Sequence, residues 1–85
     1  MMREERRFRG ISKRLAADYL ENLGGERVGE DRLEGDGWAA TLSTETVDVA
    51  GSIRLTEVTI VFEGERRRVE PLVEKFARKA MRAGG

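Results

Sequence analysis

The fold of this protein is decided by residues 38–62, which read WAATLSTETVDVAGSIRLTEVTIVF. Apolar side chains alternate with small or polar ones on either side of Gly51. They are Trp38, Ala40 and Leu42 before the glycine, and Val58, Ile60 and Phe62 after it. An alternation of period two is typical of half-buried β-strands, and a short turn between two such strands predicts an antiparallel hairpin.

The alternation changes phase within each of these strands. Val47 is out of step with Leu42, and Leu55 is out of step with Val58. Because successive side chains of a strand point to opposite faces, a change of phase indicates an extra residue or a bend. We therefore expect a bulge near residues 43–45 and a second break just before Val58.

Two amphipathic helices flank the strands. The first is expected at about residues 12–23, between an N-cap at Ser12 and a left-handed stop at Gly24-Gly25. The second is expected to begin at about residues 69–71, because Pro71 fits only near the first turn of a helix. Its apolar positions recur at helical spacing: Val69, Leu72, Val73, Phe76, Ala77 and Ala80.

The remaining segments complete an α+β fold in the order (β)-α-β-β-β-α. Residues 27–34 predict a strand, and residues 7–9 could add an edge strand with Phe8 facing inward. We expect a two-layer domain, residues 1–85, in which two helices cover an antiparallel sheet of three or four strands and a short Gly-Gly tail follows. Trp38 is expected in the core, and the opposite face of the sheet is expected to carry four polar residues: Thr41, Ser43, Arg54 and Thr59.

The composition excludes several classes of site. The 85 residues contain no cysteine and no histidine, which rules out disulfides, zinc sites built on these residues and nucleophile–imidazole pairs. We expect no enzymatic activity, no cofactor and no bound metal. The carboxylates of Glu30, Asp31, Glu34 and Asp36 are interpreted as surface acidity, since their spacing does not match a calcium loop.

The charges balance overall but are unevenly distributed. Sixteen basic and sixteen acidic residues cancel, while residues 1–14 carry +4, residues 15–65 carry −9 and residues 66–85 carry +5. If the first and last segments lie side by side, a basic surface would back onto an acidic one. Nucleic acid is not the favoured partner, because no aromatic residues interleave the basic ones. The charged start and the lack of a long apolar run predict a cytosolic protein without a membrane segment.

The chain ends in Gly84-Gly85. Turns account for the other glycines, and a helix cap requires only one glycine. Two residues without a Cβ can thread the narrow channel of an activating enzyme, where the backbone must approach ATP closely. Ubiquitin-like modifiers and sulfur carriers use their terminal carboxylate in this way. A cap at Gly84 remains the competing interpretation.

Five stretches carry a family resemblance: Phe8-Arg9-Gly10-Ile11, Tyr19-Leu20-Glu21-Asn22-Leu23-Gly24-Gly25, Gly35-Asp36-Gly37-Trp38, Gly51-Ser52-Ile53-Arg54-Leu55 and Arg78-Lys79-Ala80-Met81-Arg82-Ala83-Gly84-Gly85. In these stretches the chain resembles the C-terminal domain of proteins related to the small subunit of molybdopterin synthase, from archaea and thermophilic bacteria. Such relatives can carry this domain behind a ubiquitin-like β-grasp sulfur-carrier domain. The element order expected here differs from the ββαββ order of that fold. The resemblance implies an association with sulfur carriers.

Two hypotheses follow. The first is a small, non-enzymatic ubiquitin-like modifier or sulfur carrier whose site is Gly84 and Gly85. Its partner would be an ATP-dependent adenylating enzyme of the ubiquitin-activating type, which activates the terminal carboxylate. The alternative is an accessory module that binds a protein or RNA through its basic last helix. In both, Arg78, Lys79 and Arg82 are the candidate docking residues.

Overall fold

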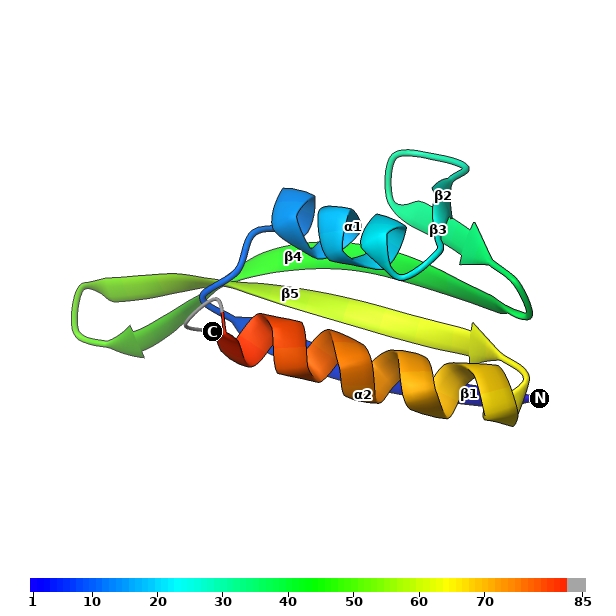
Figure 1. Cartoon of the computed structure of the whole chain (residues 1–85). Helices are drawn as coiled ribbons and strands as arrows, with labels where there is room; N and C mark the ends of the chain where they lie inside the picture. Colours follow the sequence, from blue (N-terminus) through cyan, green and yellow to red (C-terminus); the bar gives the residue numbers. More distant parts are fainter. Residues whose placement is uncertain (83–85) are drawn as a thin grey trace.

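In the computed structural model, which describes residues 1–82, two helices pack on one face of a five-stranded antiparallel sheet (Figure 1). The strands are arranged across the sheet in the order β1-β5-β4-β3-β2. The two-layer α+β architecture is therefore confirmed, with one strand more than the four expected. The elements in chain order are β1 (Met2–Arg9), α1 (Lys13–Asn22), β2 (Glu26–Arg27), β3 (Arg32–Gly35), β4 (Trp38–Ala50), β5 (Ile53–Gly64) and α2 (Arg66–Arg82).

The first strand of the chain pairs with the last one. β1 runs antiparallel to β5 over all eight of its residues, with Phe8 opposite Val58. The sequence indicated only residues 7–9 of this strand. The reason is that Glu4 and Arg6 share the helix-facing side with Phe8, so no apolar alternation marks the strand.

The single strand expected between α1 and β4 is divided into two. β2 and β3 form a short hairpin, in which the Val28 amide donates to the Arg32 carbonyl at 3.1 Å. Arg27 ties β2 to α1, because its guanidinium lies 2.9 Å from carboxylate oxygens of both Asp18 and Glu21. The hydrogen bond with Glu21 raises the pKa of Arg27 above its usual value.

The ends of α1 lie where the sequence placed them. Ser12 is the N-cap, and its hydroxyl accepts a hydrogen bond from the Leu15 amide at 3.0 Å. At the other end Gly24 has a φ of +103°, in the left-handed region that favours glycine. The amide of Gly25 then donates to the Leu20 carbonyl at 2.9 Å, as in a Schellman motif.

The second helix begins earlier than expected. α2 starts at Arg66, so Pro71 lies in its second turn and cannot donate a hydrogen bond to the carbonyl of Arg67. Val69 is fully buried, and the earlier start is supported by the amides of Arg68 and Val69, which donate to the Glu65 carbonyl at 2.9 Å and 2.8 Å. Burial of the apolar face offsets the lost hydrogen bond. The buried residues of this face are Val69, Leu72, Val73, Phe76 and Ala80.

β4 and β5 continue beyond the helices as a two-stranded hairpin, which gives the molecule its 42 Å length (Figure 1). The pairing of β4 with β5 is regular at residues 43–45, where a bulge was expected. Its one register shift lies between Asp48 and Ala50. The irregularity was therefore predicted at the wrong place in β4. Val47 and Leu55 pair with each other on the face away from the helices, because past the helices neither face is covered by a second layer.

The outer face of the sheet is largely as expected. Thr41, Ser43 and Thr59 lie on it, as the register shows. Arg54 does not. It lies on the opposite side of the hairpin, where its guanidinium pairs with Asp48 at 3.1 Å. The change of phase expected just before Val58 is absent, so the side chains of β5 alternate without interruption there. For this reason Arg54 lies on the face opposite to the one predicted.

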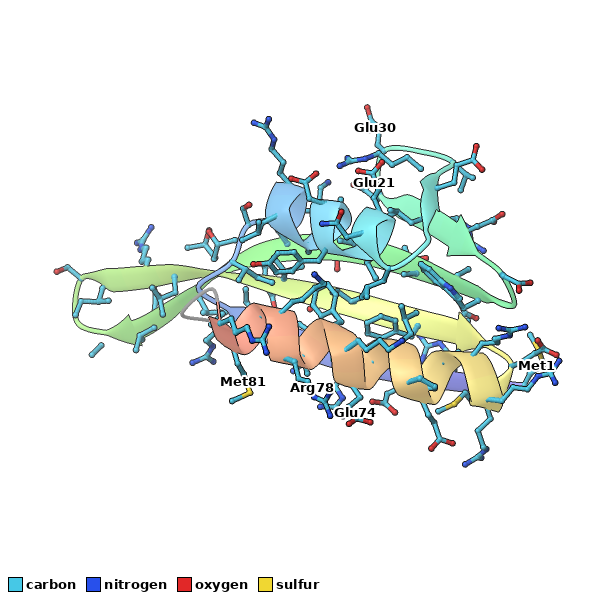
Figure 2. All side chains as sticks on the ribbon, in the orientation of Figure 1. Met1, Glu21, Glu30, Glu74, Arg78 and Met81 are labelled. Atoms are coloured by element: carbon cyan, nitrogen blue, oxygen red, sulfur yellow. The ribbon has the colours of Figure 1, made fainter. Side chains whose placement is uncertain are left out.

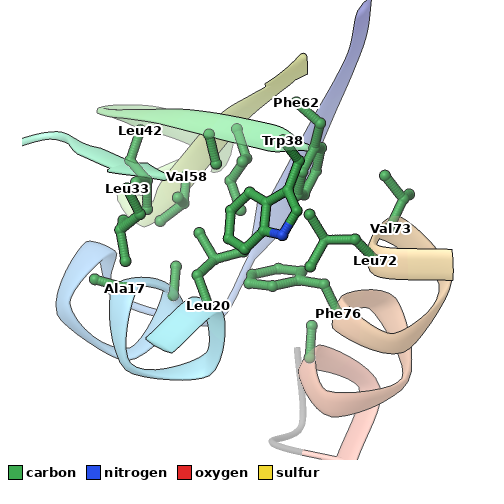
Figure 3. Close-up of a cluster of buried hydrophobic side chains, with 14 of the residues drawn as sticks. Ala17, Leu20, Leu33, Trp38, Leu42, Val58, Phe62, Leu72, Val73 and Phe76 are labelled. Carbon is green, nitrogen blue, oxygen red and sulfur yellow. The ribbon is translucent and has the colours of Figure 1, made fainter. Parts of the chain in front are cut away.

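The core fills the space between the sheet and the two helices (Figure 3). Trp38 lies in it with 9% of its surface exposed, as predicted. The indole occupies a slot formed by Gly25 and Gly35, where an added Cβ would lie 2.8 Å and 2.2 Å from the ring. These two glycines therefore do more than form turns, because they leave the space that the indole fills.

Candidate functional site

The second half of α2 is firmly attached to the body of the molecule. Phe76 is fully buried, and its ring centroid lies 4.9 Å from that of Phe8, 5.9 Å from that of Tyr19 and 6.0 Å from that of Phe62. These rings come from β1, α1 and β5, so all three elements hold the helix. Ala80, one turn further, is also buried. The core therefore holds α2 in place up to the last turn that the structure describes.

The three predicted docking residues lie on α2 in different environments. Arg78 pairs with Glu74 one turn earlier. Lys79 is half-buried, and its ammonium lies 5.7 Å from the centroid of the Tyr19 ring, in cation–π range. Arg82 is exposed, and no ion pair within residues 1–82 involves it. The three cations therefore share the end of α2 but differ in their contacts.

A shallow groove runs between α2 and the edge strand β1. Figure 2 shows Glu74, Arg78 and Met81 along the outer side of the helix. The groove has a volume of about 350 Å³, and we call it the α2–β1 groove. Met81 is 74% exposed, although it is a large apolar residue at the end of the helix. The groove is lined by Glu4, Arg6, Glu70, Val73, Glu74, Ala77, Arg78 and Met81.

Sequence reasoning missed this groove. Its β1 wall consists of Glu4 and Arg6, whose side chains pair at 2.6 Å. The first residues carry charges of both signs and no apolar alternation, and such a pattern does not predict a strand without its partner β5. Met81 follows Val73 and Ala77 at helical spacing, so the periodicity alone did not indicate that its side chain is exposed.

The first and last segments lie side by side, yet they do not form a uniformly basic surface. Four of their thirteen cations pair with a carboxylate of the same segment, as in Arg7–Glu5 at 3.2 Å and Arg66–Glu70 at 3.6 Å, and four more pair with acidic residues elsewhere in the chain. Such exposed pairs contribute little to stability, but they interleave the two signs of charge. Four of the nine net positive charges of the two segments are therefore matched by carboxylates outside them: Glu57, Asp31, Glu65 and Asp36.

The acidic residues before β4 do not gather. Asp31 pairs with Lys13, Glu34 with Arg32 at 3.1 Å, and Asp36 with Arg68 at 3.2 Å. Within residues 1–82 no group of three or more acidic side chains is placed to hold a metal ion. In the same part of the chain, no helix is both long enough and apolar enough to cross a membrane.

Gly84 and Gly85, the predicted site of activation, lie outside the described residues. A match to known proteins spans these positions: the model of the archaeal MoaD-like protein family matches residues 4–85. The chain belongs to this family. The resemblance inferred from the sequence is therefore confirmed at the level of the family. No curated protein matches the chain.

The topology of this archaeal MoaD-like chain differs from the ββαββ order of a β-grasp domain. Its described residues begin with β1 and α1, and all neighbouring strands are antiparallel. The second helix follows the last strand and closes the fold. The C-terminal residues therefore follow a helix, whereas a ββαββ domain ends in a strand.

Proposed function

We propose that this protein is a non-enzymatic carrier or modifier whose Gly85 carboxylate is activated by an ATP-dependent adenylating enzyme of the ubiquitin-activating type. The observation that carries the proposal is the match to the archaeal MoaD-like family over residues 4–85. A terminal Gly84-Gly85 suits passage of the backbone through a narrow channel, because neither residue has a Cβ.

The chemistry proceeds in two balanced steps. A carboxylate oxygen of Gly85 attacks the α-phosphorus of ATP, and pyrophosphate leaves, which produces an acyl-adenylate. A sulfur nucleophile such as hydrosulfide then attacks the acyl carbon. A C–S bond forms, AMP leaves, and the product is a thiocarboxylate. A lysine amine attacking the same carbon would instead give an isopeptide bond.

The scaffold presents the tail and provides a docking surface. Phe76 and Ala80 anchor α2 close to Arg82, the last residue that the structure describes. The α2–β1 groove lies beside this point, and its exposed Met81 offers an apolar contact to an activating enzyme. Arg78 and Arg82 flank Met81 in the sequence and would add charge complementarity to an acidic partner surface.

The decisive experiment follows the intact mass of the protein during incubation with the adenylating enzyme, ATP and sulfide. We expect a mass gain equal to the replacement of one oxygen by one sulfur. Removal of Gly84-Gly85 should abolish the gain, as should one alanine appended after Gly85, which keeps the diglycine but moves the carboxylate. An unchanged mass for the intact chain, under conditions in which the enzyme activates another carrier, would refute the proposal.

Docking is tested separately by reversing charges on α2. Arg78→Glu with Arg82→Glu should lower the rate of activation, while Arg54→Glu on the distant hairpin is the matched control, because Arg54 and Arg78 both pair with a carboxylate. If the alternative function applies, these reversals will weaken salt-sensitive binding of a protein or RNA partner. Removal of the diglycine will then have no effect on that binding.

A further inference from the structure

A second hollow lies at the opposite end of α2, where the start of this helix passes the carboxyl end of α1. Its volume is about 360 Å³, which falls within the range of small-molecule pockets. Leu23, Trp38 and Leu72 supply apolar surface to it, and Arg67, Arg68 and Lys75 supply cations. We call it the Trp38 hollow. It shares no lining residue with the α2–β1 groove.

The cations of the Trp38 hollow exceed its anions. Arg67, Arg68 and Lys75 all line it, while Asp36 is the one acidic residue in its lining. Asp36 pairs with Arg68 at 3.2 Å, but the Asp36 side chain is 87% exposed, so solvent weakens this pair. No ion pair within residues 1–82 involves Lys75. A net positive charge therefore faces the hollow.

The start of α2 places these cations unfavourably for the helix itself. The first turn contains arginines and no acidic residue, although the amino end of a helix dipole carries a partial positive charge. Cations at this end repel the dipole, and a bound anion would relieve that repulsion. Within the chain this repulsion is only partly offset, by Glu65 directly before the helix, which lies 3.6 Å from Arg67.

The indole N–H of Trp38 adds a donor from inside the core. The side chain is about nine-tenths buried, yet no hydrogen bond within the described chain involves its N–H. No polar side-chain atom of residues 1–82 is both sealed from solvent and unpaired. The N–H must therefore reach the surface, and Figure 3 shows the indole nitrogen turned toward Leu72, another residue of the hollow.

We infer that the Trp38 hollow binds a small organic phosphate monoester. Its apolar group would lie on Trp38 and Leu72, and its phosphate would face Arg68 and Lys75 with the indole N–H as a further donor. A dianion suits this site because several cations converge on it, and arginine matches phosphate oxygens in a two-pronged geometry. The inference does not depend on the diglycine or on the proposed carrier function.

The test uses Trp38 as its own reporter, since the chain has no other tryptophan. Phenyl phosphate is titrated into the full-length protein while indole fluorescence and the single indole N–H resonance are recorded. We expect a saturable change in both signals, a weaker response to inorganic phosphate, and none to phenol. Arg68→Gln and Lys75→Gln should each raise the dissociation constant roughly five- to tenfold, as expected for loss of one charged donor.

The controls separate specific binding from general charge effects. Arg78→Gln removes the same charge from another part of α2 and should leave the affinity unchanged. Removal of Gly84-Gly85 should also leave it unchanged, so failure of the carrier hypothesis and failure of this inference give different results. The inference is wrong if phenyl phosphate causes no saturable shift of the indole resonance. It is equally wrong if Arg68→Gln and Lys75→Gln bind it as tightly as the unaltered protein.

Discussion

Substitution of Gly35 by alanine tests how the core is closed around Trp38. A Cβ at this position would lie 2.2 Å from Cε2, 2.3 Å from Nε1 and 2.4 Å from Cζ2 of the indole. These atoms belong to the rigid ring of a side chain that is only 9% exposed. The ring cannot rotate away within its slot, so the alanine must displace it.

The cost is bounded by two estimates. Complete ejection of an indole that buries about 200 Å² would cost about 5 kcal/mol at about 25 cal/mol per Å². A partial shift that overpacks the core costs about 1–3 kcal/mol. We expect Gly35→Ala to lower the free energy of unfolding by about 3 kcal/mol. For a chain of 85 residues, this corresponds to a fall in Tm of roughly 15 °C.

The assay is urea denaturation followed by circular dichroism, with two comparisons. Gly29→Ala is the matched control, because no atom lies within 4 Å of the added Cβ, and it should be neutral or slightly stabilising. In a Trp38→Leu background the ring is gone, so Gly35→Ala should cost little, which gives a coupling energy of about 2 kcal/mol or more. Equal stability of Gly35→Ala and Gly29→Ala would refute the account of the slot.

Three further substitutions test single contacts, each by the shift of the urea midpoint. Arg9→Ala removes the cation that pairs at 3.0 Å with Glu57, an acidic residue that is only 7% exposed, and should lower the free energy of unfolding by about 1–2 kcal/mol. Arg7→Ala, in an exposed ion pair, should lower it by less than about 0.5 kcal/mol. A result for Arg9→Ala equal to that for Arg7→Ala would contradict the role of burial. Ser12→Ala removes the N-cap of α1 and should cost about 1 kcal/mol, and no loss would mean that water satisfies the amide equally well. Gly24→Ala forces a residue with a Cβ to φ +103° and should cost about 1 kcal/mol, which a neutral result would exclude.

Local signals were sufficient for much of the fold. Ser12 and Gly24 fix the ends of α1 through hydrogen bonds that involve only neighbouring residues, so the sequence could place them. The turn around Gly51 and the core position of Trp38 follow equally from short-range pattern. By contrast, the start of α2 was misplaced, since the burial of Val69 outweighs the local penalty of Pro71.

The contacts of the candidate docking residues could not be predicted from the sequence. The sequence nominated Arg78, Lys79 and Arg82 because they crowd one helix, but only the packed structure shows that Arg78 is paired with Glu74 and that Lys79 lies over Tyr19. The composition of a segment gives its charge. It does not give the partner of each charge, which depends on the rotamers and on the neighbouring elements.

The sequence by itself determined the ends of α1 and the hairpin of β4 and β5, because alternation, caps and turns are properties of neighbouring residues, and it also carried the resemblance to the family. Only the tertiary structure decided that β1 lies beside β5, and that an indole fills the space between two glycines ten residues apart. It also decided that the α2–β1 groove and the Trp38 hollow both lie against α2. The physical reason is that packing joins residues distant in sequence, and the free energy of such contacts depends on shape and burial that no local pattern encodes.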